Sequence, residues 1–447
     1  MSDTAAAPLH LRLRHYLSYG VGQIGNQVMR DVPGAMLLFY MTNALAIPPS
    51  YAGLAILIPK LWIIIADPMV GMLSDRTRTR LGARKPYLIG GSLISGLAFM
   101  LLFSVPVPDD EALRAVLIGT LYWLLSTAFS FYSVPYLTLA SELGDEPYQR
   151  TKALAFRQYF GLAGVLAGLS VAPWLIALMG GTRSGYALMG VALGTLILVT
   201  TMLTAIFVPV RQPTRTAPQP GNILVQMRSA FRHRPFRIIF LASAAQLFGF
   251  GFHSSGMVYF IVYFLKLPLT TVSGFILASV AGAAIGQPLW VMLAKRHRTI
   301  VAYRWATAWY GLAHLLCLFL SPGDEWIFFA IGLFGGVGTC GLTLLSFAML
   351  VETIGLDGPD SPRKGLFTSA YTAMEKAMLA CGSFGVAAVL SLAGFVRGGG
   401  AGADVVQPAS VSSGVAWAYV GGPAIMMIVA IAILSTYDPR KATAASA

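Results

Sequence analysis

The feature that most constrains this chain is a series of twelve apolar segments, each long enough to cross a bilayer as an α-helix. About 20 apolar residues span the roughly 30 Å of hydrocarbon, and only helices or closed barrels satisfy their backbone groups there. Of the 447 residues, 56% are apolar and 11% are charged, far fewer charges than soluble domains carry. The sequence therefore predicts a polytopic membrane protein. The segments cover residues 16–45, 51–75, 87–107, 112–142, 153–180, 185–210, 235–266, 270–293, 302–320, 325–354, 365–395 and 413–436.

A polar break divides the twelve segments into two sets of six. We interpret residues 1–210 as an N-terminal six-helix bundle, 211–234 as a cytoplasmic linker and 235–447 as a C-terminal six-helix bundle. Residues 66–78 and 286–298 also match, with Pro, Met, Leu and two Arg at a constant offset of 220. Duplicated halves around a central cavity are a transporter architecture, with the solute site near the midplane. The predicted fold class is an all-α membrane protein with twelve transmembrane helices in two pseudo-symmetric halves.

Positive charge is distributed unevenly along the chain. The net charge is +13, from 31 Lys and Arg against 18 Asp and Glu. With both termini in the cytoplasm, 23 of the 31 basic residues fall on the inner side, and four fall outside, namely Arg114, Arg183, Lys266 and Arg397. Basic loops are retained in the cytoplasm. We therefore predict cytoplasmic termini, and we attribute the excess charge to orientation in the lipid bilayer and not to a nucleic-acid partner.

Motifs typical of catalysis are absent from the sequence. The three cysteines, Cys317, Cys340 and Cys381, lie inside apolar runs and lack the spacing of metal ligands. Nothing resembles a phosphate-binding loop, a redox motif, a zinc pair or a nucleophile elbow. We therefore expect no catalytic residue, no cofactor and no metal site. Neither an enzyme nor an ATP-driven pump is supported.

Five short motifs resemble a known transporter family. Residues 71–76 with 82–86 resemble the loop 2–3 signature of the major facilitator superfamily. More narrowly, the chain resembles the glycoside–pentoside–hexuronide cation symporters, the family of melibiose permease. That resemblance rests on Tyr19–Gly25, Ala66-Asp67-Pro68, Val134-Pro135-Tyr136 and Glu375-Lys376, and it spans nearly the whole chain. It implies the major facilitator fold and secondary active transport.

Asp67 is the candidate cation-binding residue. It lies about two-thirds of the way through the second segment, where an ionised carboxylate costs on the order of 3 kcal/mol and should face a wet interior. The resemblance places Asp67 in the family's coupling-ion site, whereas a fixed salt bridge is the structural alternative. Ile63 and Ser133 stand where sodium-using members carry further carboxylates. Sodium needs several oxygen ligands and a proton needs one base, so the sequence favours proton coupling.

Candidate solute-binding residues come partly from the resemblance and partly from the residues themselves. Gln27 stands where the family has a sugar-contacting acid, and Asp31, one helical turn later, can present a carboxylate to the same cavity. The resemblance also implies a sugar contact for Arg157 and a functional amine at Lys376. Ser133 and His253 complete the set of candidates that we consider, which is Gln27, Asp31, Ser133, Arg157, His253 and Lys376.

Several of these candidates also have a purely structural explanation. Arg30 and Asp31 can form packing pairs between helices, and Arg157 can snorkel toward the inner surface. A lone intramembrane histidine such as His253 is more often a satisfied interior residue. Lys376 is harder to explain in this way, because it lies about eleven residues into its segment.

The loop after the second segment carries candidate gating residues. Asp75 and the basic run that includes Arg76 and Arg84 can form an ion-pair latch with neighbouring helix ends in one conformation and break it in the other. The alternative is that these charges serve membrane orientation alone. Both roles are compatible.

Together, these features predict an inner-membrane symporter, coupled to protons in preference to sodium, that imports a small solute by alternating access. The resemblance implies a sugar, glycoside or uronide as the solute. One alternative is a transporter of an amphiphile such as a lysophospholipid. A second alternative, of another class, is a non-transporting membrane sensor or assembly factor.

Overall fold

The computed structural model describes residues 12–143, 147–209, 231, 234–355, 364–398 and 406–437. Most of the predicted linker at 211–234 lies outside the described residues. Within the described ranges all regular secondary structure is helical, as predicted.

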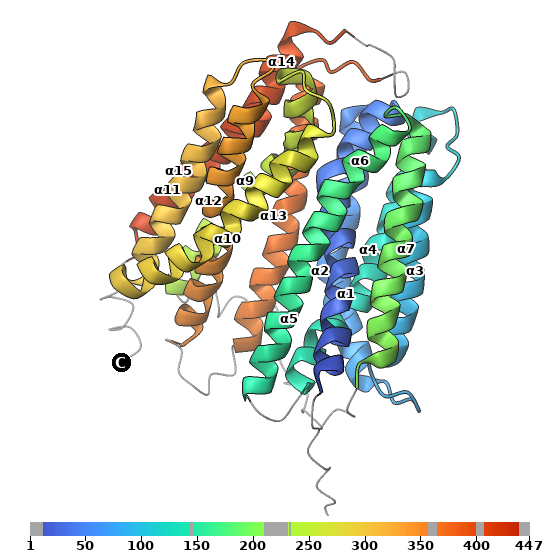
Figure 1. Ribbon diagram of the computed structural model, residues 1–447, viewed down its shortest axis with the longest axis vertical. Helices are drawn as coiled ribbons and strands as arrows, with labels where there is room; N and C mark the ends of the chain where they lie inside the picture. Colours follow the sequence, from blue (N-terminus) through green and yellow to red (C-terminus); the bar gives the residue numbers. More distant parts are fainter. Residues whose placement is uncertain are drawn as a thin grey trace, which may run out of the picture. The chain divides into compact units, whose positions relative to one another are not determined.

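The first six membrane helices, whose α-helical parts are labelled in Figure 1, also contain short π-helical turns that are named η1 to η3 here. Helix 1 is built from three pieces and helix 5 from three. In chain order the elements are α1 (Leu13–Val32), η1 (Pro33–Leu37), η2 (Tyr40–Ala44), α2 (Pro49–Arg76), α3 (Lys85–Ser104), α4 (Glu111–Glu142), α5 (Pro147–Val165), η3 (Leu166–Ser170), α6 (Val171–Leu178) and α7 (Arg183–Phe207).

The last six membrane helices follow the same plan. The seventh membrane helix, α9, ends in the π-helical turn η4, and the ninth, α11, ends in the short 3-10 turn η5. The twelfth consists of α14 and α15 with the π-helical turn η6 between them. The elements are α9 (Arg234–Tyr259), η4 (Phe260–Phe264), α10 (Thr271–His297), α11 (Thr299–Leu316), η5 (Cys317–Phe319), α12 (Glu325–Gly355), α13 (Lys364–Leu392), α14 (Ala409–Ala416), η6 (Trp417–Gly421) and α15 (Gly422–Ser435).

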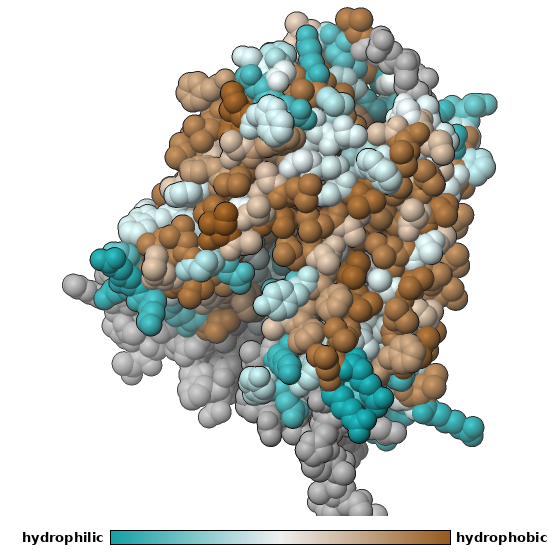
Figure 2. Space-filling model, in the orientation of Figure 1, coloured by the Kyte–Doolittle hydropathy of each residue, from teal (hydrophilic) through white to brown (hydrophobic). Residues whose placement is uncertain are grey.

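Ten of these helices are long and apolar enough to cross a membrane, among the residues that the structure describes. The helices that begin with α1 and α11 bring the total to twelve, as predicted. Polar residues lower the mean hydropathy of both helices, among them Gln23, Asn26 and Gln27 in α1 and Arg304 and His314 in α11. Hydrophobic residues cover most of the face drawn in Figure 2, and hydrophilic residues gather toward the helix ends. Such a surface is suited to hydrocarbon and not to water.

The chain forms two compact units. One comprises Met1–Pro33 and Trp62–Ala217, and the other comprises Gly34–Leu61 and Pro218–Ala447. The boundary therefore passes through helices 1 and 2, so that the second part of helix 1 and the first half of α2 pack with the C-terminal helices. In the first unit α1 packs against α5 and α7, and α3 packs against α4 and α7.

The internal repeat predicted from the sequence recurs in the backbone. The π-helical turns η2 and η4 begin at Tyr40 and Phe260, which differ by 220. Each turn is followed by a residue with positive φ, 52° at Ala46 and 54° at Lys266, again 220 apart. Non-glycine residues rarely adopt this conformation. The same unusual helix end at the same offset shows that the first membrane helix, which begins with α1, and the seventh, which begins with α9, are structurally equivalent.

The two equivalent helix ends also touch each other within the second unit. The hydroxyl of Thr42 lies 2.6 Å from that of Tyr259, and the Tyr263 hydroxyl donates a hydrogen bond to Asn43 Oδ1. Asn43 and Tyr263 are themselves 220 residues apart, as are Phe39 and Tyr259, whose rings pack with centroids 5.2 Å apart. Equivalent residues therefore meet their own counterparts, as expected around a pseudo-twofold axis.

Candidate functional site

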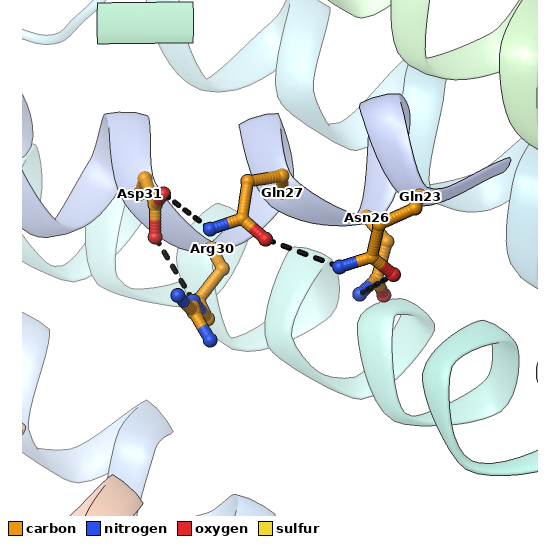
Figure 3. Close-up of polar contacts among 5 residues, drawn as sticks. All are labelled: Gln23, Asn26, Gln27, Arg30 and Asp31. Atoms are coloured by element: carbon orange, nitrogen blue, oxygen red, sulfur yellow. Dashed lines mark hydrogen bonds and ion pairs between the residues drawn. The ribbon is translucent and has the colours of Figure 1, made fainter. Parts of the chain in front are cut away.

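The candidate site lies in the first compact unit, on one polar side of α1. Gln23, Gln27 and Asp31 recur at intervals of four residues, so they share a face of the helix. Gln23, Asn26 and Gln27 are 4%, 6% and 8% exposed. Buried polar groups of this kind must be hydrogen-bonded to be tolerated. Figure 3 shows that the side chains meet this requirement mainly by bonding to one another.

These side chains form a continuous hydrogen-bonded row. Gln23 Nε2 donates to Gln27 Oε1 at 3.1 Å, and Gln27 Nε2 donates to Asp31 Oδ2 at 2.7 Å. Asn26 Nδ2 donates to Gln23 Oε1 at 3.3 Å. At the far end Arg30 Nε donates to Asp31 Oδ1 at 2.9 Å, and these two side chains are 50% and 18% exposed. The row therefore ends in an ion pair within α1.

Arg157 reaches this row from α5. Its Nε donates to Gln23 Oε1 at 3.1 Å, and its guanidinium lies 5.9 Å from the centre of the Tyr136 ring. Tyr136 is fixed in turn by donating its hydroxyl to the Tyr19 carbonyl at 2.9 Å. Arg157 is half-buried and tied to α1, so it does not simply snorkel to the surface. Among the described residues, its two terminal nitrogens donate no hydrogen bond.

Glycines on α5 allow this close approach to α1. A Cβ at Gly161 would lie 3.3 Å from Gln23 Cγ, and a Cβ at Gly164 would lie 2.9 Å from the Ile24 carbonyl oxygen. Small residues at helix interfaces bring backbones together in membranes. The spacing of glycines after Arg157 therefore places the guanidinium within reach of Gln23.

The cluster combines one excess positive charge with several neutral amides. Arg30, Asp31 and Arg157 sum to a single positive charge. Asn26 Oδ1 is buried and accepts no hydrogen bond from the described residues. A guanidinium with terminal nitrogens to offer can bind a carboxylate, sulfonate or phosphate with two hydrogen bonds. The arrangement is suited to a small polar anion.

Three other predicted residues, Ser133, Asp67 and Lys376, lie on α4, α2 and α13. Ser133 is buried in α4 of the same unit, 6% exposed. Asp67 is half-buried in α2, one turn after Ile63, which is 1% exposed. Lys376 is half-buried in α13 of the second unit. Within the first unit the hydrogen bonds therefore bring together Gln27, Asp31 and Arg157, through Gln23.

His253 belongs to a different cluster, in the second unit. Its Nδ1 lies 3.0 Å from Nε2 of His314, whose Nδ1 lies 3.0 Å from the Tyr310 carbonyl oxygen. Because a carbonyl only accepts, His314 Nδ1 donates to it, and with both rings neutral His253 then donates to His314. The His253 ring also stacks on Tyr419 at 5.3 Å. This histidine is held among α9, α11 and η6 as an interior residue.

The predicted gating residues Asp75, Arg76 and Arg84 differ in their exposure and in their ion pairing. Arg84 Nη2 lies 3.2 Å from Asp75 Oδ1, and the Arg84 side chain is buried while that of Asp75 is 63% exposed. Arg76 is exposed. Lys85 donates to the Ile206 carbonyl at 3.0 Å, which ties the loop to α7. Asp75 and Arg84 thus pair with each other and Arg76 is exposed, and a gating role for these residues stays a prediction.

Sequence analysis missed three residues of these clusters, namely Gln23, Asn26 and His314. Gln23, the centre of the polar row, lies inside a motif that was noted only for its resemblance, although its position four residues before Gln27 was a usable signal. His314 lies 61 residues from His253. The contact between these two histidines could be identified only from the structure, in which α11 packs against α9.

Comparison with known proteins agrees with this architecture. The inner membrane symporter YicJ of Escherichia coli (strain K12) is 22% identical over 349 residues, which cover 77% of this chain and 74% of YicJ. The sphingosine-1-phosphate transporter MFSD2B of Mus musculus is 25% identical over 306 residues, 62% of this chain and 60% of MFSD2B.

A solved structure shares the fold. A crystal structure of a mutant of the nucleoside transporter NupG has a TM-score of 0.67 at 13% identity and covers 93% of this chain and 99% of that chain. The family model described as MFS/sugar transport protein matches residues 18–439. Because this match spans nearly the whole sequence, the chain belongs to the MFS/sugar transport protein family, whose members are membrane transporters and not enzymes.

Proposed function

We propose that this protein is a proton-coupled symporter that imports a sugar, glycoside or uronide carrying one negative charge. The observation that carries this proposal is the cluster of Gln23, Gln27 and Asp31 with Arg157 in the first compact unit. The amides can exchange hydrogen bonds with solute hydroxyls, and the guanidinium can bind the anionic group.

The charge balance of the cluster favours an anion over a neutral sugar. Gln27 replaces the acid that the resembled family uses to contact sugar, while Arg157 is kept. A half-buried guanidinium without a carboxylate partner among the described residues is costly in the membrane. A solute that brings a carboxylate or sulfonate offsets that cost, and a neutral sugar does not.

Proton coupling is proposed from the oxygen ligands that surround Asp67. One turn before Asp67 the chain has the buried Ile63, and Ser133 replaces a second carboxylate of the family pattern. Two carboxylates fewer leave too few oxygen ligands for sodium. We propose that Asp67 takes up the coupling proton and that Lys376 serves as its counter-charge or as a donor to the solute. His253 is left out of the solute site because it bonds to His314.

The proposed location is the inner membrane of the cell, with both termini in the cytoplasm. The distribution of basic residues supports this orientation. The relative YicJ, named an inner membrane symporter, supports the choice of membrane.

A second candidate is transport of an anionic amphiphile. The relative MFSD2B, named a sphingosine-1-phosphate transporter, supports it. A phosphate group and a carboxylate would both suit Arg157, so the two candidates differ in the apolar part of the solute and not in its charge.

Uptake into proteoliposomes tests the proposed solute. We expect D-glucuronate to enter vesicles under an imposed pH gradient and D-glucose to enter far more slowly. Arg157→Gln should lower glucuronate uptake by about tenfold or more, since a charge-assisted hydrogen bond contributes about 1.5–3 kcal/mol. Arg114→Gln removes an arginine near the outer loop and should leave uptake unchanged.

Each other result has a definite meaning for the proposal. Uptake of D-glucose that does not depend on Arg157 would contradict an anionic solute. Transport of sphingosine-1-phosphate without glucuronate would favour the second candidate. Absence of flux and of exchange for all three probes, with folded protein in the vesicles, would favour a sensor or assembly factor.

A further inference from the structure

The hydrogen bonds along α1 all point in one direction, and both ends dictate that direction. A guanidinium can only donate, so Gln23 must turn its oxygen to Arg157 and its nitrogen to Gln27. An ionised carboxylate can only accept, so Gln27 must turn its nitrogen to Asp31. The donor at one end and the acceptor at the other therefore fix the same orientation for the two amides between them.

This row, which we call the amide chain, is also isolated from water. Gln23 and Gln27 are 4% and 8% exposed, so neither amide can easily replace a lost partner with solvent. Gln23 and Asp31 are eight residues apart, about 12 Å along a helix. If the hydrogen-bond partner at one end changes from acceptor to donor, the amides along the row must reorient, or a buried polar group is left without a hydrogen bond.

We propose that the amide chain links protonation of Asp31 to the position of Arg157, which makes Asp31 a proton-binding residue coupled to the anion site. This inference rests on the proposed role of Arg157 in binding an anionic solute. It adds a protonation site on helix 1 to the one proposed at Asp67 on helix 2.

The linkage follows from one proton transfer. A proton from water binds Asp31 Oδ2 and forms an O–H bond there, while Oδ1 stays bonded to Arg30. Oδ2 now donates, so the Gln27 amide turns over to present its oxygen, and the Gln23 amide follows. Gln23 then presents its nitrogen to Arg157 Nε, so that two donors face each other. Arg157 leaves Gln23 and frees its Nε–H group as a further donor for the anion, and loss of the proton to water reverses these changes.

Proton and anion should therefore bind with positive coupling. Protonation removes the negative charge of Asp31, which raises the charge of the cluster from one to two positive. Over about 12 Å this charge effect alone is worth about tenfold in anion affinity at an effective dielectric constant of about 20. The amide chain adds the release of Arg157. Coupling of this kind is reciprocal, so anion binding also favours protonation of Asp31.

The surroundings of the amide chain contain few other ionisable groups. α1 packs against α4, α5, η3 and α7. Among the described side chains α5 contributes Arg157 and also Lys152, which lies 5.0 Å from the Tyr16 ring, and α4 contributes Tyr136 and Tyr132, whose rings stack on each other. Arg30 lies on α1 itself. The side of α7 that meets α1 is lined by threonines, namely Thr200, Thr201 and Thr204.

The test uses an asparagine in place of the protonated acid and needs no solute. In Asp31→Asn the side-chain oxygen stays with Arg30, so its amide nitrogen faces Gln27 and imposes the reversed orientation. Full-length protein in lipid nanodiscs is treated with phenylglyoxal at one neutral pH, and mass spectrometry of the Arg157 peptide gives its rate of modification. We expect Asp31→Asn to raise this rate several-fold.

Two further variants distinguish transmission through the amide chain from the other effects of Asp31→Asn on Arg157. In Gln27→Met, which breaks the row, adding Asp31→Asn leaves only the effect of the lost charge, so the rate at Arg157 should rise clearly less than it does with the row intact, and Gln27→Leu serves if that variant does not fold. In Asn26→Ala, which removes a bond beside the row, Asp31→Asn should still raise it. Arg30 contacts Asp31 directly, so its own rate should change in every background and reports that the substitution acted locally.

Two results would overturn the linkage. Equal rates at Arg157 in the wild type and Asp31→Asn would show that Asp31 does not act on Arg157. A rise of the same size in Gln27→Met would show that charge acts through space alone and that the amides do not transmit the change. Since no solute or ion gradient is involved, either result would leave the proposed symport standing. Conversely, a failure of pH-driven uptake would leave the linkage between Asp31 and Arg157 intact.

Discussion

At the residue scale, α1 shows how a membrane helix can hold a polar site with few charges. Each ionised side chain in the hydrocarbon costs several kcal/mol, whereas amides bonded to one another cost far less. Gln23 bonds to Arg157, Asn26 and Gln27 at once. One neutral residue thereby positions the guanidinium and connects it to Asp31.

Lys376 is the residue outside this cluster whose role is tested most simply. It is half-buried in α13, and an ammonium at that position is retained at a cost in free energy. We expect Lys376→Ala to lower uptake by at least about tenfold, or about 1.4 kcal/mol, with normal amounts of protein in the membrane. Lys295→Ala, at an exposed position near the end of α10, is the matched control. Uptake close to wild type in Lys376→Ala would leave only a packing role.

The sequence predicted part of the site and not its connections. Helical periodicity placed Gln27 and Asp31 on one face, and the family resemblance singled out Arg157. Neither could show that Gln23 joins them, because the direction of an amide is set by what faces it in space. His253 was ambiguous for the same reason, since its partner His314 lies on another helix.

At the scale of elements, the contact between α1 and α5 depends on a row of glycines. Gly161, Gly164 and Gly168 all face α1, and a Cβ at Gly164 would meet Gln27 Cβ at 2.8 Å. The two helices can approach closely only because these positions lack side chains. The site is thus built by the helix interface as much as by its polar residues.

Substitution of Gly164 tests this interface. Gly164→Ala should destabilise the protein by about 1–3 kcal/mol through overpacking and should lower Tm in a thermal unfolding assay in detergent. Gly90→Ala is the matched control, because a Cβ at Gly90 meets no atom within 4 Å and alanine favours the helix. An unchanged or raised Tm for Gly164→Ala would show that α5 can move away from α1 without loss.

The extents of the helices were largely predictable, whereas their π-helical turns were not. The segment predicted at 16–45 corresponds to Leu13–Ala44, and the one at 87–107 to Lys85–Ser104. Hydropathy reports the length of a span, because the hydrocarbon sets it. It does not report η2 or η4, because a wider turn changes the hydrogen bonds and not the apolar character of the residues.

At the scale of the whole molecule, the halves predicted from the sequence and the compact units of the structure divide the chain at different residues. The predicted halves follow the duplicated sequence, whereas the compact units assign Gly34–Leu61 to the C-terminal helices. A repeat in the sequence shows which helices are equivalent, and it cannot show against which neighbours a helix end packs.

The orientation of the molecule in the membrane is tested by labelling single cysteines. In a background without Cys317, Cys340 and Cys381, we expect Asp109→Cys to react with an impermeant thiol reagent from outside intact cells. Thr214→Cys, in the predicted linker, should react only after the cells are opened. The distribution of basic residues predicts this result, because 23 of 31 fall on the inner side if both termini are cytoplasmic. Labelling of the linker in intact cells would mean that the orientation is inverted.

Accumulation of D-glucuronate in proteoliposomes under imposed ion gradients tests proton-coupled symport most directly. We expect a pH gradient to drive accumulation above equilibrium and a sodium gradient at constant pH to have no effect. Asp67→Asn should still exchange labelled for unlabelled glucuronate but fail to concentrate it. Sodium-driven accumulation at constant pH, or full accumulation by Asp67→Asn, would contradict proton coupling at Asp67.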